Sequence, residues 1–143
     1  MEQRVSLITL AVEDTDRAAD FYEALGWTRV ESPDGVIAFD LIGQTLGLYP
    51  KAALADELGI DVSQIGGFSG VSFGHNLRTK EEVAPFLDRA RAAGGKILKE
   101  AQDVFWGGHH GYFADPDGHV WEVAHNPFSP LGANGEFQWN GAE

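Results

Sequence analysis

The side chains of this chain that are best suited to acid–base or metal chemistry are five histidines and one glutamate, all in its second half. They are His75, His109, His110, His119, His125 and Glu122. Imidazoles and carboxylates transfer protons and coordinate divalent metals. No spacing among the histidines matches a known metal-binding motif, which favours surface and loop histidines with no shared target. A metal site that joins His109 or His110 to Glu122 stays open as the alternative.

The elements that must position these residues follow from an internal repeat. A shift of 65 positions places Leu7 on Ser72 and Asp14 on Thr79. The same shift aligns two apolar helix stripes, each spaced i, i+3, i+4, i+7, which are Ala18, Phe21, Tyr22 and Leu25 in the first half and Val83, Phe86, Leu87 and Ala90 in the second. A strand-like run precedes each stripe and three more follow it. The repeat predicts one domain of two βαβββ halves, at about 4–50 and 68–127, with a ligand site where they meet.

Local signals define the elements within each half. The first helix is expected from Asp14 to about Leu25, and a Thr79/Glu82 capping box begins the second helix, whose first turns Pro85 should bend or loosen. The segment 51–67 joins the halves and includes a possible short helix, and the tail 128–143 is expected to pack on a surface. The remaining expected strands are Trp27–Glu31, Val36–Leu41, Thr45–Tyr49, Lys96–Glu100, Gly111–Ala114 and His119–His125, with turns at 32–35 and 115–118.

Composition limits the classes of function. The chain has 143 residues, no cysteine and a formal net charge of −12. Without cysteine, disulfides, thiolate nucleophiles and zinc–thiolate sites are excluded. The negative charge disfavours nucleic acid and anionic membranes as partners and favours neutral or cationic small molecules. No apolar run is long enough to span a membrane, and residues 1–4 do not resemble a signal peptide, so a cytoplasmic location is expected.

Three groups of segments carry a family resemblance. They are Thr9–Asp14 with Phe21-Tyr22 and Leu25-Gly26, then Gly70–Phe73, then Tyr112–Gly118 with Trp121-Glu122. Together they resemble the vicinal oxygen chelate superfamily, which includes glyoxalase I, extradiol dioxygenases, fosfomycin-resistance enzymes and bleomycin-binding proteins. The resemblance extends from about Val5 to Pro127. It implies an α+β fold of paired βαβββ modules, whose eight strands form an open cup around a ligand, and a homodimer that covers exposed strand edges.

The resemblance also implies four positions for metal ligands. They correspond here to Leu7, Ser72, either Leu46 or Leu48, and Glu122. Only Glu122 offers a good donor, and one carboxylate does not hold a catalytic divalent ion well. We therefore expect no metal and no other cofactor.

Strand alternation predicts which side chains face the cup. The expected ligand-binding residues are Leu7, Thr9, Leu46, Leu48, Ser72, Gly74, Asn76, Trp106 and Tyr112. Glu122 is the ionisable group expected among them, and Asn76 is its candidate partner. His75, His125 and Trp121 have the opposite parity and should face away from the cup. Trp106, next to Gly107-Gly108, is the best candidate for a mobile side chain that contacts ligand.

Two hypotheses for function follow. The first is a metal-independent protein that binds a small apolar or aromatic molecule, including cationic ones. The second is a glyoxalase-like lyase or isomerase in which Glu122 transfers a proton next to a carbonyl, with or without a relocated metal. A third possibility is a cup filled by the protein's own side chains.

Overall fold

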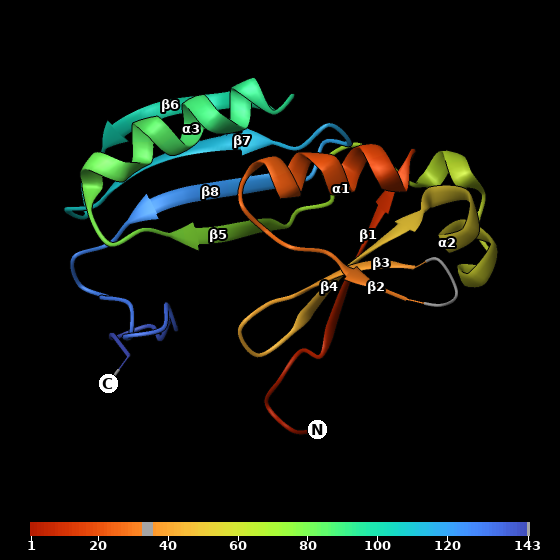
Figure 1. Ribbon diagram of the computed structural model, residues 1–143, viewed down its shortest axis with the longest axis horizontal. Coiled ribbons are helices and arrows are strands. Elements are labelled where there is room, and N and C mark those ends of the chain that lie inside the picture. The colour runs from red at the N-terminus through yellow and green to blue at the C-terminus, as the bar shows by residue number, and fades with distance from the viewer. Residues whose placement is uncertain (33–35, 143) are drawn as a thin grey trace. The chain divides into compact units, whose positions relative to one another are not determined.

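The structure is a computed structural model, and it describes residues 1–32 and 36–142. The chain forms two compact units, Met1–Ser69 and Gly70–Glu143. Most of the turn expected at 32–35 lies outside the described residues. Each unit contains one four-stranded sheet with strands in the same order, so the α+β fold of two βαβββ modules is confirmed (Figure 1).

The first unit has strand order β1-β4-β3-β2. β1 is parallel to β4, and the other two pairs are antiparallel. Its elements are β1 (Leu7–Val12), α1 (Thr15–Ala24), β2 (Val30–Glu31), β3 (Ile37–Asp40), β4 (Thr45–Pro50), α2 (Lys51–Leu58) and the 3₁₀ turn η1 (Val62–Gln64).

The second unit repeats this topology in the order β5-β8-β7-β6, again with its first and last strands parallel. Its elements are β5 (Ser72–Asn76), η2 (Lys80–Glu82), α3 (Val83–Ala92), β6 (Lys96–Asp103), β7 (His109–Ala114) and β8 (Val120–His125). β1 and β5 begin at Leu7 and Ser72, as the 65-residue repeat predicts.

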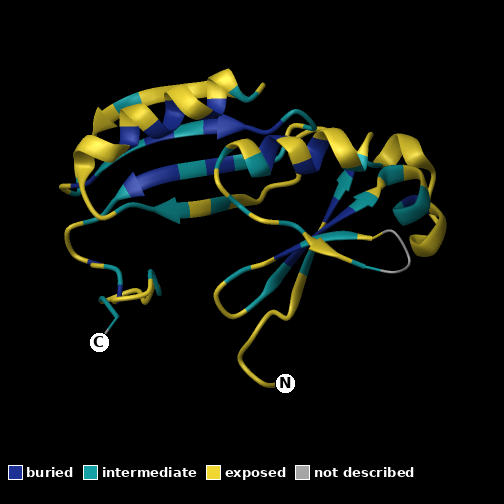
Figure 2. Ribbon diagram, viewed as in Figure 1, coloured by how far each residue is buried: buried dark blue, intermediate teal, exposed yellow. Residues whose placement is uncertain are grey.

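Each long helix covers one face of its own sheet through the predicted stripe (Figure 2). In α1, Phe21 and Tyr22 are buried, and the Tyr22 ring contacts Phe39 of β3. In α3, Phe86 contacts Phe113 of β7. The Asp14 side chain accepts a hydrogen bond from the Arg17 backbone N–H, which defines the start of α1.

The start of α3, the long helix of the second unit, agrees with the sequence signals. The Thr79 and Glu82 capping box is present, and residues Lys80–Glu82 form a 3₁₀ turn before α3 begins at Val83. Pro85 therefore occupies the first turn of α3, where a missing N–H removes no intrahelical hydrogen bond.

Two expectations for the first unit are wrong. The strand expected at Trp27–Glu31 contains only Val30 and Glu31, because Trp27 instead stacks on Tyr22 with ring centroids 5.2 Å apart. The second error concerns Leu46 and Leu48, which pair with Ile8 and Leu10 in the parallel register.

This register places Leu46 and Leu48 on the α1 face, opposite to Leu7 and Thr9. Both leucines are buried, and Leu46 also pairs with Phe39, which contacts α1. Gly47, which pairs with Thr9, lies on the face of Leu7, since a Cβ at Gly47 would lie 3.4 Å from Leu7 Cδ1. Large aliphatic side chains here build the helix–sheet core.

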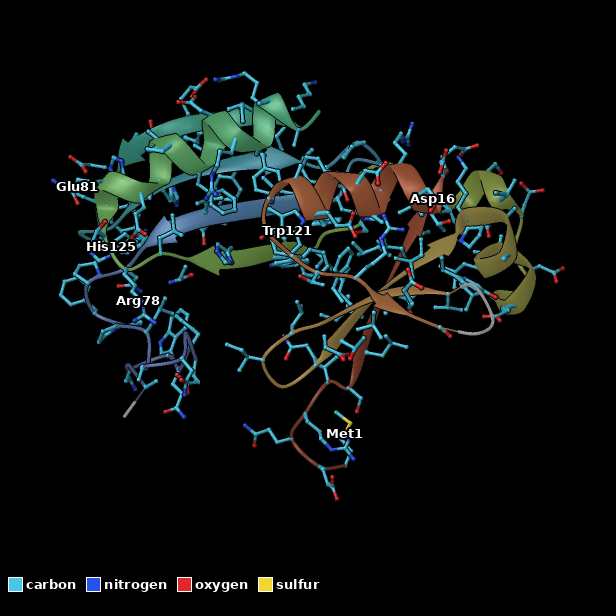
Figure 3. The ribbon with its side chains drawn as sticks, viewed as in Figure 1. Met1, Asp16, Arg78, Glu81, Trp121 and His125 are labelled. Atoms are coloured by element: carbon cyan, nitrogen blue, oxygen red, sulfur yellow. The ribbon has the colours of Figure 1, made fainter. Side chains whose placement is uncertain are left out.

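The tail after β8 is held to its own unit by Arg78. The Arg78 guanidinium donates hydrogen bonds to the carbonyl oxygens of Gly132 and Ala133, at 3.0 and 3.3 Å. The Ser129 hydroxyl donates to the Trp139 carbonyl. Figure 3 shows Arg78 beside the tail, which packs as the sequence predicts.

His75 faces α3, on the side that its strand parity predicts. Its ring lies 5.2 Å from that of Phe86, and burial, with a smaller effect of Arg89, lowers the pKa of His75. The unfolded chain therefore binds this proton more readily, and the free energy of unfolding should fall as pH drops below about 6.5.

His75→Leu should reduce this loss of stability, because it removes the group that resists protonation. Urea unfolding between neutral and mildly acidic pH measures the effect, with His119→Gln as the control. An unchanged pH dependence in His75→Leu would show that other groups cause the acid destabilisation.

Candidate functional site

The candidate site is the face of the second sheet that points away from α3. Phe113 and Trp121 face the helix side, where Phe113 contacts Phe86 and stacks on Trp121. Residues on alternating positions therefore face the other side. The cross-strand register places Gly74 and Tyr112 on either side of Glu122. The residues of this face in the three neighbouring strands include Ser72, Gly74, Asn76, His110, Tyr112 and Glu122.

Three of these residues form a hydrogen-bonded group that we call the Glu122 cluster: His110, Tyr112 and Glu122. The Tyr112 hydroxyl donates to Glu122 Oε2 at 2.9 Å. His110 Nδ1 lies 2.8 Å from the same oxygen. An ionised carboxylate only accepts hydrogen bonds, so Nδ1 carries the hydrogen and the neutral ring has its lone pair on Nε2. Both donors reach Oε2, which leaves Oε1 as the oxygen of the carboxylate that a ligand can use.

The Glu122 cluster is half-buried, and the phenol of Tyr112 within it keeps its proton. The side chains of His110 and Glu122 are 12% and 28% exposed. Burial, followed by the hydrogen bond to Glu122, raises the pKa of Tyr112. The hydroxyl therefore stays protonated at physiological pH and acts as a donor, while Glu122 stays within reach of solvent.

Trp106 lies at the edge of this cluster, above a glycine that leaves room for its ring. A Cβ at Gly108 would lie 2.0 Å from two atoms of the Trp106 indole. The indole is in turn edge-on to His110, with centroids 6.3 Å apart, and His110 is edge-on to Tyr112 at 5.2 Å. Gly108 therefore sets the position of Trp106 next to the cluster.

Gly108→Ala should displace Trp106 with little loss of stability, because the obstructing atoms belong to a side chain that can rotate. We expect the free energy of unfolding to change by less than about 1 kcal/mol. The NMR signals of the Trp106 indole and the His110 ring should both move, and Trp106→Ala should move His110 similarly. Unchanged His110 signals in both variants would mean that the two rings do not interact.

The structure brings five of the predicted site residues together in the second unit, Ser72, Gly74, Asn76, Tyr112 and Glu122, with Trp106 at their edge. In the first unit, Leu7 and Thr9 share the face away from α1, and Leu46 and Leu48 do not. The partners of Glu122 are His110 and Tyr112, not Asn76. His109 has the opposite parity from His110 and contacts Asp103 instead.

Sequence reasoning gave His110 a role only as a candidate metal ligand. It treated residues 106–111 as a loop, whereas β7 begins at His109. The available signal was strand alternation, since His110 lies two positions before Tyr112. Extending the strand by two residues would have placed both on the Glu122 face.

The residues present do not fit the metal site that the resemblance implies. The four positions are Leu7, Gly47 in place of the expected leucines, Ser72 and Glu122. Glu122 is the one good ligand among them, and its Oε2 accepts two hydrogen bonds. Among the residues that the structure describes, no three or more His, Asp or Glu side chains are placed to hold a metal ion.

Comparison with known proteins identifies the family. A family model described as the Glyoxalase/Bleomycin resistance protein/Dioxygenase superfamily matches residues 4–123. A solved structure of a glyoxalase-related enzyme from Fulvimarina pelagi is 38% identical, with a TM-score of 0.87 over 96% of this chain and 98% of that chain. The chain belongs to the glyoxalase/bleomycin resistance/dioxygenase superfamily, as its segments predict.

More distant structures share the fold. A family enzyme from Burkholderia phytofirmans PsJN is 20% identical, with a TM-score of 0.72 over 85% of this chain and 98% of that chain. A lactoylglutathione lyase from Agrobacterium tumefaciens is 23% identical, with a TM-score of 0.64 over 88% and 96% of the two chains. No curated protein matches the sequence. In the described part of the chain, no helix is long and apolar enough to cross a membrane.

Proposed function

We propose that this protein binds a small planar organic molecule, neutral or cationic, at the Glu122 cluster without a metal ion. The observation that carries this proposal is the pair of hydrogen bonds that His110 and Tyr112 make to one oxygen of Glu122. They fix the carboxylate in one orientation. A fixed, partly buried acceptor is the kind of polar group that orients a ligand in a small-molecule site.

The charge of the site favours a cationic or hydrogen-bond-donating ligand. Glu122 Oε1 is available to accept, and a charge-assisted hydrogen bond from an ammonium is stronger than one between neutral groups. The net charge of −12 acts in the same direction at long range. An anionic ligand would meet repulsion from both.

The aromatic rings around the carboxylate suit a planar ligand. Trp106, His110 and Tyr112 follow one another edge-to-face. Such rings offer faces and edges to an aromatic molecule and bind cations over their faces. Gly74, directly across from Glu122 in the register, has no side chain to block this approach.

Metal independence is supported by the small number of metal-binding side chains at the expected positions. Of the four positions that the resemblance implies for metal ligands, Glu122 alone offers a good donor, and one carboxylate does not hold a catalytic divalent ion well. The proposal further includes the homodimer and the cytoplasmic location that the sequence predicts.

A lyase or isomerase is the second candidate, and the His110–Glu122 hydrogen bond is the observation that favours it. A carboxylate held beside an imidazole can take a proton from the carbon atom next to a carbonyl. The imidazole can stabilise the charge of the carboxylate or relay the proton. The fold is shared with a lactoylglutathione lyase, although the low identity supports the fold alone.

Three compounds with one ring system and different charges test the proposal: naphthylmethylammonium, naphthylmethanol and naphthoate. NMR titration should show that the ammonium binds most tightly and the carboxylate most weakly. The bound compound should shift the side-chain signals of His110 and Tyr112 and leave His119 unchanged. The proposal fails if none of the three affects His110, or if naphthoate binds best.

A further inference from the structure

A pair of histidines, His109 and His125, lies in the same unit as the Glu122 cluster, on the other face of the sheet. His109 and His125 have the parity of the helix-facing residues, opposite to that of Glu122. They line a surface hollow of about 340 Å³, together with Lys80, Asp103, Val104, Gly107 and Gly108. Figure 3 shows His125 and Glu81 at the end of the unit where α3 begins. Nothing in the proposed function uses this hollow.

The two histidines are direct neighbours across β7 and β8. His109 pairs with His125 in the antiparallel register, and opposite residues of such a pair have Cβ atoms about 5 Å apart. The pairing of β7 with β8 is therefore enough to bring the two imidazoles close together.

Each imidazole has one nitrogen occupied by an acceptor. His109 Nδ1 lies 2.9 Å from Asp103 Oδ1, and His125 Nδ1 lies 3.3 Å from the Leu77 carbonyl oxygen. A carboxylate and a carbonyl only accept, so each Nδ1 carries the hydrogen. In the neutral rings the lone pair is then on Nε2, in both histidines of the hollow.

We propose that His109 and His125 bind a divalent transition metal ion through their Nε2 atoms. Histidines that bind metals usually donate the other ring N–H to a carboxylate or a backbone carbonyl, and both arrangements occur here. Imidazole nitrogens select Cu²⁺, Ni²⁺ and Zn²⁺ over Mg²⁺ and Ca²⁺, with Cu²⁺ bound most tightly.

The site has two protein ligands, and water completes the coordination. This agrees with the lack of any cluster of three or more ligating side chains in the described residues. Lys80 also lines the hollow, and its ammonium opposes a divalent cation. Asp103 is a positioning residue, because its hydrogen bond orients the His109 ring and keeps the hydrogen on Nδ1.

The test uses untagged full-length protein, free of metal, titrated by calorimetry with Cu²⁺ and Zn²⁺ near neutral pH. One ion should bind per chain, and His109→Asn or His125→Asn should each weaken binding at least tenfold. Asp103→Asn should weaken it about ten- to a hundredfold while both ligands stay in place. Lys80→Gln should strengthen it. His119→Asn keeps the same number of histidines as the ligand variants and should bind normally.

Electron paramagnetic resonance of the Cu²⁺ complex provides an independent readout. Two imidazole nitrogens should couple to the copper in the wild type, and one of the two couplings should be lost in His109→Asn and in His125→Asn. The inference is overturned if no ion binds, or if phosphate binds while the metals do not. It is also overturned if binding survives in both histidine variants. Loss of binding in Glu122→Gln instead would place the metal at the Glu122 cluster and contradict the proposed function as well.

Discussion

Glu122→Gln is expected to lower the affinity for naphthylmethylammonium at least about tenfold, which corresponds to about 1.4 kcal/mol. The substitution keeps the shape of the side chain and an oxygen that accepts from Tyr112, but it removes the negative charge. The free energy of unfolding should change less, or even increase, because a partly buried carboxylate is costly to desolvate.

Two comparisons make this result specific to charge. Naphthylmethanol, which lacks the ammonium group, should bind the wild type and Glu122→Gln with similar affinity. Tyr112→Phe removes one of the donors that fix Glu122, and should weaken ammonium binding less than Glu122→Gln does. If naphthylmethylammonium binds Glu122→Gln as tightly as the wild type, the carboxylate is structural and the face recognises ligands by shape and apolar contact alone.

Gly111→Ala is expected to destabilise the second unit by about 1–3 kcal/mol. A Cβ at position 111 would lie 2.4 Å from Leu87 Cδ1, 2.7 Å from the Lys99 carbonyl oxygen and 3.2 Å from the Ala101 nitrogen. The leucine can rotate, but the backbone of β6 cannot move without breaking its pairing with β7. Gly111 is thus required by the close approach of the α3 side chains and the irregular β6 backbone.

Urea unfolding measures this effect, and Gly74→Ala is the matched control in the same sheet. The nearest atom to a Cβ at Gly74 is Asn76 Oδ1 at 3.8 Å, so that substitution meets no obstruction. Equal stability of the two alanine variants would show that the sheet and α3 accommodate the methyl group at position 111 by a small shift.

The repeat made the topology predictable because both halves preserve the same local signals. The N-caps, the apolar stripes and the first strand of each half keep one spacing, so Leu7 and Ser72 begin equivalent strands. Strand alternation then placed Ser72, Gly74 and Glu122 on one face, and Trp121 and His75 on the other. Within a single strand the period of two needs no knowledge of tertiary structure.

The first-half prediction for Leu46 and Leu48 was wrong because register between strands does not follow from alternation within one strand. A shift of one residue exchanges the two faces. In this half the α1 face takes the leucines, and Gly47 is left beside Thr9. The physical reason is the burial of two large aliphatic side chains against α1, which the assumed register of β4 did not take into account.

His110 was difficult to place because the glycines around it, Gly107-Gly108 and Gly111, indicate a loop rather than a strand. The register between β6 and β7 shifts twice, but the extra residues lie in β6, and β7 pairs with β8 without a shift. The alternation within β7 is therefore intact and places His110 on the face of Tyr112 and Glu122. The 65-residue repeat does not help here, because β7 has six residues and β3 has four.

Metal independence of the Glu122 cluster is tested most directly by titrating naphthylmethylammonium into protein dialysed against EDTA and into untreated protein. The His109→Asn variant is measured in parallel, so that an ion at the histidine pair does not influence the comparison. We expect the same affinity in all samples, with the same shifts of His110 and Tyr112. Affinity that is lost with EDTA, restored by one equivalent of Zn²⁺, and not restored in Glu122→Gln would contradict the account.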